Sequence, residues 1–508
     1  MASQNSLMLL CCNEAPVPSK TMKITRNDFK PDFVFGAATS AYQIEGAFAD
    51  GGKGLSNWDT FTLGRRDKIA DGSNGCVAID GYNLYKEDVK TIKKVGLDAY
   101  RFSIAWSRVL PGGRLGAGIN KEGIKYYSDL IDALLAEGIE PHVTLFHWDI
   151  PQCLENEYGG FLNKQIIDDF LEYVELCFWE FGDRVKYWIT LNEPWTFTNH
   201  GYVEGKFPPG HGAPQPPQTP IPQHKSHCKV TEVATKGDPG TEPYIVAHNL
   251  ILAHAKAVDL YRRQFQQSQK GKIGITNVSK WFEPLNDTKA DQETAKRCVD
   301  FMLGWFVAPV VTGYYPPIMR KLVAERLPKF SHEEKNLVIG SYDFLGINYY
   351  TTNYVTYTPK PEGTVPPKGD SDWTCIVRRG IRSLLHHIKK TYNNPPIYIT
   401  ENGVSEVNDE NKTISEARSD DLRINECVNV KGYFIRSLFD NFEWEAGYTV
   451  RFGIFYVGYK DGRFTRYPKK SAIWWKNFLV KKAKLKRQVE QMDDAESVKR
   501  LRNGLAYE

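Results

Sequence analysis

The chain has 508 residues, of which 41% are hydrophobic and 25% are charged, a balance typical of folded proteins and not of disordered ones. Its 65 basic and 61 acidic residues leave a net charge of +4, which argues against a nucleic-acid-binding protein or an enzyme that acts on polyanions. No run of about 18 apolar residues occurs, so the sequence predicts no membrane-spanning helix and no membrane partner.

The N-terminal residues 1–28 are interpreted as a flexible extension. Their apolar run, Leu7–Cys12, has only six residues, whereas the apolar core of a secretory signal needs about 7–15 residues after a basic flank. The first basic residue, Lys20, follows the run, so we expect a protein that is not secreted. The nine cysteines include no CxxC pair, so neither a disulfide framework nor a zinc site is expected.

Eight short apolar runs follow in chain order and alternate with amphipathic helical patterns such as Gly123–Glu137 and Asn163–Phe181. The predicted strands are Phe33–Ala38, Ala99–Ile104, His142–Phe146, Tyr187–Leu191, Ile273–Asn277, Phe344–Ile347, Ile397–Thr400 and Val430–Phe434. Eight such units favour an α/β fold with a single (β/α)8 TIM barrel over residues 29–478. A doubly wound open sheet is the alternative, but the first strand lacks the GxGxxG loop expected of a nucleotide-binding sheet.

Two long segments rich in proline and glycine, Lys206–Pro243 and Tyr357–Asp372, are predicted to be loops. Loops that follow barrel strands build the active-site mouth. A glutamate stands at the end of two of the strands: Glu193 after the fourth and Glu401 after the seventh. A lone glutamate of this kind is usually a solvated loop residue or a salt-bridge partner. Two in matching contexts, each beside an asparagine, leave both that interpretation and a catalytic pair open. Enzymes that hydrolyse glycosides typically use two carboxyl groups on opposite sides of the bond that breaks.

Other polar or flat side chains also follow strands, where a sugar would find hydroxyl partners and an aromatic surface. Each alone has an ordinary explanation, since His147, for example, is more often a core histidine. The group consists of Gln43, His147, Asn192, Glu443 and Trp444.

Seven ordered motifs carry a resemblance to glycoside hydrolase family 1, the retaining β-glucosidases, from about residue 29 to 478. They are SAYQIEG at 40–46, RFSIAWSR at 101–108, TLFHW at 144–148, TLNEP at 190–194, NYY at 348–350, ITENG at 399–403 and DNFEW at 440–444. The chain is most similar in character to plant members that deglucosylate alkaloids or other specialised metabolites, of the raucaffricine and strictosidine type.

The resemblance implies a (β/α)8 barrel with no metal and no organic cofactor. It assigns Glu193 as acid/base and Glu401 as nucleophile. Family members that cleave thioglucosides carry Gln in place of Glu193, and those that cleave phosphorylated sugars lack the Glu443–Trp444 pair. The expected partner is therefore a neutral small-molecule β-glucoside, with no nucleic acid, and a homo-oligomer is expected from the family. The implied substrate-binding residues are Gln43, His147, Asn192, Tyr350, Trp373, Glu443, Trp444 and Phe452.

The implied mechanism needs the two carboxyl groups about 5–5.5 Å apart. Ionised Glu401 is expected to raise the pKa of Glu193 by repulsion, so that Glu193 can donate a proton to the leaving oxygen. Once Glu401 is esterified and uncharged, Glu193 acts as the base for water.

The sequence departs from the family pattern at four places. Arg436 replaces the tryptophan that lies under the glucose ring, and it could pair with Glu443 or Glu401. Only residues 424–427 separate Arg423 from Val428, which predicts that part of the crossover helix before the last strand is missing. The loop after Tyr350 is shorter than in plant relatives, and Cys228 lacks its usual partner cysteine.

Two functions remain open at this point. The chain is predicted to be a working β-glucosidase; the alternative is an impaired or inactive relative that acts as a binding or oligomer partner. The C-terminal tail 479–508 holds two basic clusters, 481–487 and 499–502, which fit either a solvated helix or a nuclear-localisation signal. We therefore expect a cytoplasmic or nuclear protein.

Overall fold

The computed structural model describes residues 25–212, 237–358, 381–403, 405–407, 430–460 and 462–479. The chain divides into two units, residues 32–477 and residues 1–31 together with 478–508. In the smaller unit the described residues include the short 3-10 helix Arg26–Asp28, and the ring of Phe29 meets that of Phe478 edge to face at 6.1 Å. The predicted boundaries at residues 28 and 478 remain predictions.

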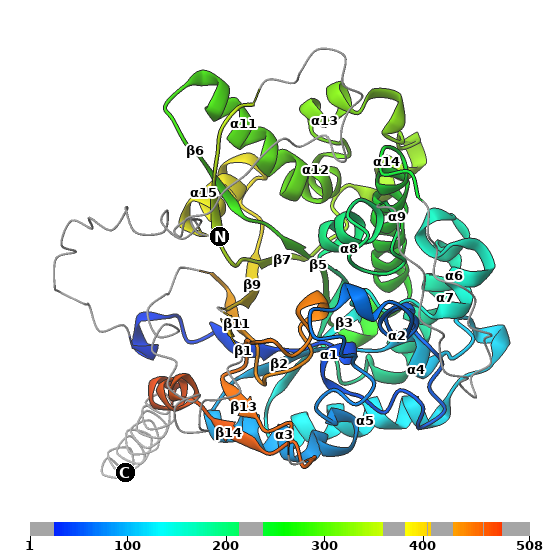
Figure 1. The fold of residues 1–508 in the computed structure, drawn as a ribbon, viewed down its shortest axis with the longest axis vertical. Coiled ribbons are helices and arrows are strands. Elements are labelled where there is room, and N and C mark those ends of the chain that lie inside the picture. Colours follow the sequence, from blue (N-terminus) through cyan, green and yellow to red (C-terminus); the bar gives the residue numbers. More distant parts are fainter. Residues whose placement is uncertain are drawn as a thin grey trace, which may run out of the picture. The chain divides into compact units, whose positions relative to one another are not determined.

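The described part of the larger unit contains a closed barrel of parallel strands in the order β1-β11-β9-β7-β5-β4-β3-β2 (Figure 1). The strands are β1 (Val34–Ala38), β2 (Ala99–Ser103), β3 (Glu140–Phe146), β4 (Tyr187–Asn192), β5 (Lys272–Val278), β7 (Phe344–Asn348), β9 (Ile397–Asn402) and β11 (Gly432–Arg436). The predicted TIM barrel is thus confirmed and the open sheet excluded. The last strand begins and ends two residues later than predicted, and its final residue is Arg436.

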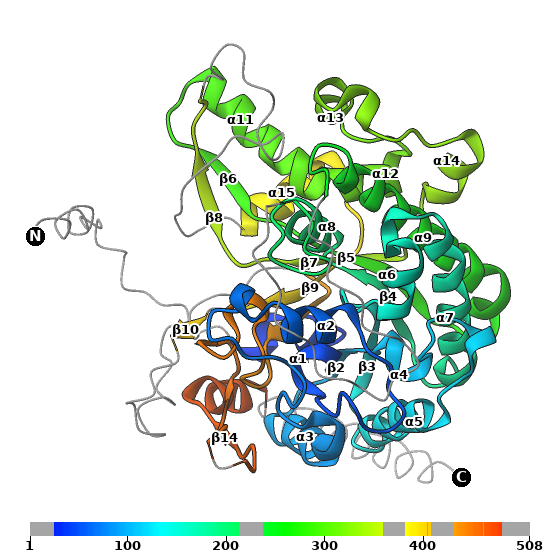
Figure 2. The ribbon, with the colours of Figure 1, turned by 45° about the vertical axis from the view of Figure 1, so that its right-hand side comes forward.

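Helices surround the strands in both ribbon views (Figures 1 and 2). The longer ones are α3 (Gly81–Val95), α5 (Lys121–Ala136), α7 (Gln165–Phe181), α9 (Glu242–Leu260), α11 (Lys289–Val299) and α15 (Ile381–Thr391). The shorter ones are α1 (Ala41–Ile44), α2 (Asn57–Gly64), α4 (Trp106–Val109), α6 (Gln152–Tyr158), α8 (Pro194–Tyr202), α10 (Gln266–Gln269), α12 (Trp305–Thr312), α13 (Pro317–Leu322) and α14 (His332–Val338).

Helix α5 shows why these segments are helical. The side chain of Asn120 accepts a hydrogen bond from the backbone N–H of Glu122 and so caps the first turn. Tyr127, Ile131 and Leu134 recur at helical spacing and are fully buried, so one face of α5 packs inward. The predicted helices 123–137 and 163–181 correspond to α5 and α7.

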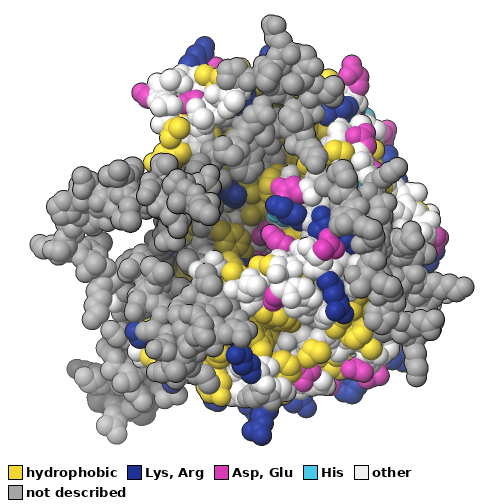
Figure 3. Space-filling view, viewed as in Figure 1, with side chains coloured by type: hydrophobic (Ala, Val, Ile, Leu, Met, Phe, Trp, Pro, Cys, Tyr) yellow, Lys and Arg dark blue, Asp and Glu magenta, His cyan; other side chains and the backbone are white. Residues whose placement is uncertain are grey.

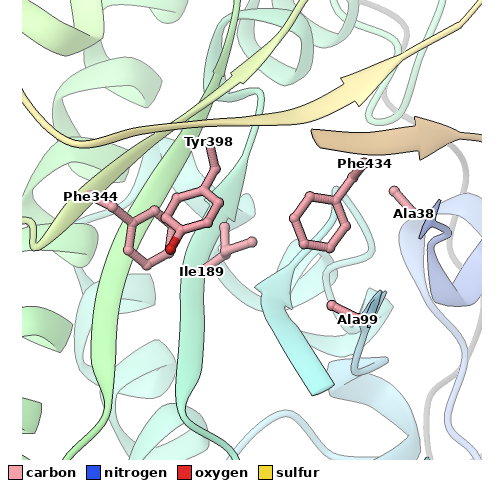
Figure 4. Close-up of a cluster of buried hydrophobic side chains, with 6 residues drawn as sticks. All are labelled: Ala38, Ala99, Ile189, Phe344, Tyr398 and Phe434. Carbon is pink, nitrogen blue, oxygen red and sulfur yellow. The ribbon is translucent and has the colours of Figure 1, made fainter. Parts of the chain in front are cut away.

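The barrel interior is filled by side chains of unequal size. Ala38 and Ala99 lie in one cluster with Ile189, Phe344, Tyr398 and Phe434, all buried (Figure 4). Gly36 of β1 faces this cluster closely, since a Cβ there would stand 2.4 Å from the Phe434 ring. Small residues on β1 and β2 therefore make room for the aromatic rings, and the barrel is closed by packing.

Three two-stranded sheets accompany the barrel: β6 (Trp281–Pro284) with β8 (Thr352–Val355), β10 (Glu406–Val407) with β12 (Val450–Arg451), and β13 (Phe455–Val457) with β14 (Arg466–Pro468). Helix α11 lies against β6 (Figure 2). Among the helices of the described ranges, none is both long and apolar enough to cross a membrane.

The proposed shortening before the last strand falls at residues 424–427, which lie outside the described residues, as does Cys228. The strands on either side of that segment nevertheless pair directly, with Tyr433 of β11 opposite Ile399 of β9. Among the cysteines of the described residues, Cys76, Cys177 and Cys298 are free thiols.

Candidate active site

Both predicted catalytic glutamates lie at the carboxyl ends of barrel strands and are buried. Glu193 follows β4 and Glu401 lies within the end of β9, with 5% and 4% of their surface exposed. In the barrel wall, β5 and β7 lie between β4 and β9. The last residue of β7, Asn348, is in register with Glu401. A face of the molecule is hollowed between hydrophobic and charged side chains (Figure 3).

Neutral side chains donate hydrogen bonds to both carboxylate oxygens of Glu193. Its Oε1 accepts a hydrogen bond from Asn348 Nδ2 at 2.6 Å, and its Oε2 accepts one from Thr196 Oγ1 at 2.7 Å. Its backbone has φ of 41°, in the left-handed region, at the point where β4 turns into α8. Such strain costs on the order of 1–3 kcal/mol and persists mainly at functional sites, where surrounding structure enforces it.

The pKa of Glu193 is raised from its ordinary value to about 7. Burial is the larger cause, and repulsion from Glu401 is the second. The sequence argument named repulsion alone, so its account of the cause was incomplete. The resulting protonation state is the expected one, because a carboxyl with this pKa holds its proton below neutral pH.

Glu401 is surrounded by donors, two of which are cationic. Its Oε1 accepts from Arg101 Nη1 at 2.5 Å, and its Oε2 accepts from Tyr350 Oη at 2.5 Å and lies 3.0 Å from Arg436 Nε. Burial alone would raise the pKa of Glu401, but Arg101 and then Arg436 lower it to about 2. Glu401 is therefore ionised while Glu193 is protonated, the division of roles that a nucleophile and an acid require.

The hydrogen bond from Tyr350 helps hold the Glu401 carboxylate in place and in its ionised form. We expect Tyr350→Phe to lower kcat for an aryl β-glucoside by roughly tenfold, on the scale of a lost hydrogen bond to a charged group. The acidic limb of the pH–rate profile should move to higher pH because Glu401 loses a donor. Unchanged kcat and an unchanged acidic limb would show that Tyr350 does not act through Glu401.

Hydrogen bonds hold several of the predicted sugar-binding residues. Gln43 Nε2 donates to Asn441 Oδ1 at 2.9 Å and to the Phe442 carbonyl at 2.7 Å, which ties α1 to the segment that follows β11. Asn192 Nδ2 lies 3.0 Å from His147 Nε2. These contacts hold the polar side chains in fixed orientations before any ligand arrives.

Trp444 lies among other aromatic rings rather than on the surface. Its ring centroid is 4.5 Å from that of Trp148 and 4.6 Å from that of Trp58, and its plane is nearly parallel to the His147 ring at 5.8 Å. Trp444 and Trp148 both have positive φ, 54° and 77°. The backbone is thus strained at two further residues of the site.

Three buried polar atoms in this region have no hydrogen-bond partner among the described residues: His147 Nδ1, Glu443 Oε1 and Arg436 Nη1. Buried polar atoms are nearly always paired, so these three can take hydrogen bonds from a polar ligand. Burial lowers the pKa of His147 to about 3, which leaves its ring neutral and suited to hydroxyl groups.

Arg436 makes both of the pairings that its sequence position predicted. Besides its Nε contact with Glu401, its Nη2 donates to Glu443 Oε2 at 2.7 Å, and its guanidinium lies 4.6 Å from the centre of the Phe452 ring. Gly403 is required beside it, because a Cβ there would stand 1.8 Å from the Arg436 carbonyl oxygen. The guanidinium is therefore part of the site.

The sequence analysis assigned no role to two residues that contact the glutamates. Arg101 binds Glu401 and also Asn192 Oδ1 at 2.6 Å, and Asn348 binds Glu193. Both stand in the family motifs given above, and their positions, Arg101 within one predicted strand and Asn348 directly after another, were the signal for them. Phe452 meets Tyr350 edge to face at 6.3 Å, so it belongs to the same region. Trp373 lies outside the described residues.

Comparison with known proteins agrees with this geometry. The model of the family described as "Glycosyl hydrolase family 1" matches residues 25–484. The chain is 55% identical to oleuropein beta-glucosidase of Olea europaea, over 96% of each chain. It is 52% identical to raucaffricine-O-beta-D-glucosidase of Rauvolfia serpentina, over 94% of this chain and 97% of that one.

Solved structures show the same likeness. A rice beta-glucosidase matches with a TM-score of 0.81 and 44% identity, over 90% of this chain and 99% of the rice chain. A mutant of that enzyme, solved in a covalent complex with glucose, matches with a TM-score of 0.80 over the same shares.

Proposed function

This chain belongs to glycosyl hydrolase family 1, and from that premise we propose that it is a retaining β-glucosidase with Glu401 as nucleophile and Glu193 as acid/base. The observation that carries the proposal is the contrast in hydrogen-bond partners between two buried carboxyl groups in one site. Arg101 keeps Glu401 ionised, whereas Glu193 accepts hydrogen bonds only from neutral side chains among the described residues.

In the first step, Glu401 attacks the anomeric carbon and the bond from that carbon to the leaving oxygen breaks. Glu193 transfers its proton to that oxygen, so the aglycone leaves as a neutral alcohol. The negative charge of Glu401 is consumed in the ester, which removes the repulsion that Glu193 feels. Glu193 then takes a proton from water, whose oxygen attacks the same carbon and releases Glu401 and β-glucose.

We propose that the substrate is the O-β-glucoside of a plant specialised metabolite, with an alkaloid among the candidate aglycones. The support is the high identity to enzymes named for oleuropein and raucaffricine. The basic clusters of the tail support a cytoplasmic or nuclear protein, which imaging of a tagged full-length chain would check.

Hydrolysis of p-nitrophenyl β-D-glucoside by the purified chain tests the proposal. We expect β-glucose as the first sugar product, visible by proton NMR before mutarotation. Because Glu193 must be protonated, kcat/KM should be level at pH 4–6 and fall above a pKa of about 7.

A matched variant separates Glu193 from other groups that titrate near neutral pH. With 2,4-dinitrophenyl β-D-glucoside, whose phenolate leaves without a proton, Glu193→Gln should still form the glucosyl-enzyme and should show no basic limb. α-Glucose as the first product, or a basic limb that persists in this variant, would contradict the proposed roles.

A further inference from the structure

Arg436 brings a fixed positive charge into the part of the site that binds the sugar. Only 8% of the residue's surface is exposed. Nε contacts Glu401 and Nη2 contacts Glu443, while Nη1 has no partner among the described residues. An orphaned donor on a buried guanidinium calls for an acceptor, and an anionic acceptor is bound most strongly.

The charges of the described groups in the site sum to zero, so an added anion would not meet a net negative charge. Glu401 is balanced by Arg101, and Glu443 by Arg436, while Glu193 carries its proton and His147 is neutral. With an uncharged residue at position 436 the same group would carry a net charge of −1. Burial raises the pKa of Glu443 to about 7, and the attraction of Arg436 acts in the opposite direction.

The geometry indicates where such an anion would sit on a sugar. The anomeric carbon has to meet Glu401, which contacts one edge of the Arg436 guanidinium. Glu443 binds the guanidinium at another nitrogen, and the Phe452 ring lies over it at 4.6 Å. Arg436 therefore spans the space between the nucleophile and Glu443, a residue that the family resemblance assigns to the sugar, so an anion bound at its Nη1 would belong to the sugar rather than to the aglycone.

We propose that the sugar site also takes sugars with a carboxylate at C6, and that it hydrolyses β-D-glucuronides with Arg436 as the residue that binds this carboxylate. The inference rests on the proposed function for its chemistry and on Arg436 for its specificity. A glucuronide differs from a glucoside only in having a carboxylate in place of the C6 hydroxymethyl group. Arg436 can donate a hydrogen bond to this carboxylate from Nη1, and its positive charge strengthens that bond.

The reaction itself is unchanged. Glu401 forms a bond to C1 as the C1–oxygen bond breaks, and the proton of Glu193 goes to the leaving oxygen. Water then adds to C1, its proton returns to Glu193, and the bond to Glu401 breaks. The C6 carboxylate takes no part in these steps and acts only as a binding group.

The test compares p-nitrophenyl β-D-glucuronide with p-nitrophenyl β-D-glucoside at pH 5.5, using the purified full-length chain. Wild type should hydrolyse both. Arg436→Met should lower the glucuronide-to-glucoside ratio of kcat/KM at least about tenfold, since a charged contact is lost for one substrate only. Arg436→Lys should keep part of the ratio, because it retains the charge without the planar donors.

Arg436→Met leaves Glu443 buried without its partner and could unfold the site, so a double variant, Arg436→Met with Glu443→Gln, accompanies it. It removes both charges of the pair, and it should show the same loss of the ratio with a melting temperature close to that of wild type. A ratio that stays within twofold of wild type in both variants would overturn the inference.

Failure of the inference is distinguishable from failure of the proposed function. If the glucoside is hydrolysed and the glucuronide is not, the β-glucosidase stands and the inference falls. If neither is hydrolysed, the proposed function and the glucuronidase activity both fall. Binding of D-glucuronate and D-glucose, followed by tryptophan fluorescence, then decides the specificity: tighter glucuronate binding that Arg436→Met abolishes supports the site, and equal binding rejects it.

Discussion

Glu401→Gln is expected to lower kcat for p-nitrophenyl β-D-glucoside by about four to six orders of magnitude, the scale seen when an enzyme loses its nucleophile. The amide has nearly the same shape as the carboxylate but cannot form the glycosyl ester. It also removes the negative charge that contributes to the raised pKa of Glu193.

The fold should survive this change, because the amide keeps the shape of the carboxylate and one oxygen acceptor, which serves either Arg101 or Tyr350. Glu325→Gln, on an exposed turn, is the matched control and should leave kcat within twofold of wild type. Circular dichroism checks folding of both variants. A folded Glu401→Gln variant that retains a tenth of the wild-type rate would mean that another residue attacks the sugar.

Arg436→Trp is expected to raise kcat/KM for the same glucoside by about 30- to 1000-fold, which corresponds to roughly 2–4 kcal/mol of transition-state stabilisation. In the present site the Arg436 guanidinium is bound to Glu401 Oε2 and Glu443 Oε2. A neutral sugar therefore has to displace it from both oxygens. An indole would release both carboxylates and present an aromatic face to the sugar ring.

The acidic side of the pH profile provides a second readout. Without Arg436 the pKa of Glu401 should rise from about 2, because one of its two cations is gone. The acidic limb should therefore appear at higher pH in Arg436→Trp. Activity that falls in this variant, with an unmoved acidic limb, would show that Arg436 supports glucoside turnover rather than restraining it.

Wild type and Arg436→Trp together also test the alternative that this chain is a non-catalytic partner. That alternative requires Arg436 to obstruct the site. Folded wild type that binds glucose without turnover, beside an active Arg436→Trp, would favour a chain disabled at this residue alone. Turnover by wild type would exclude that role.

Much of the architecture could be predicted from local patterns. Runs such as Tyr187–Leu191 are mostly apolar because strands of a closed parallel barrel are buried on both faces, and helices such as α5 carry one apolar stripe. A strand end was the least certain feature, because pairing with neighbours and not local sequence decides where a strand stops. The last strand accordingly ends at Arg436, two residues beyond its predicted end.

The sequence by itself determined the barrel, and with it the placement of Glu193 and Glu401 at the same end of parallel strands. It also indicated that Arg436 could reach either Glu401 or Glu443. These follow from the chain's periodicity and motif order, because every parallel strand delivers its carboxyl end to the same face.

Only the tertiary structure decided the electrostatics of the site. Arg101 and Arg436, 335 residues apart by their numbers, both contact Glu401, and Asn348 reaches Glu193 from another strand. Burial outweighs repulsion in raising the pKa of Glu193. Charge interactions and desolvation depend on distances across the barrel, and those distances exist only once strands remote in sequence have closed upon one another.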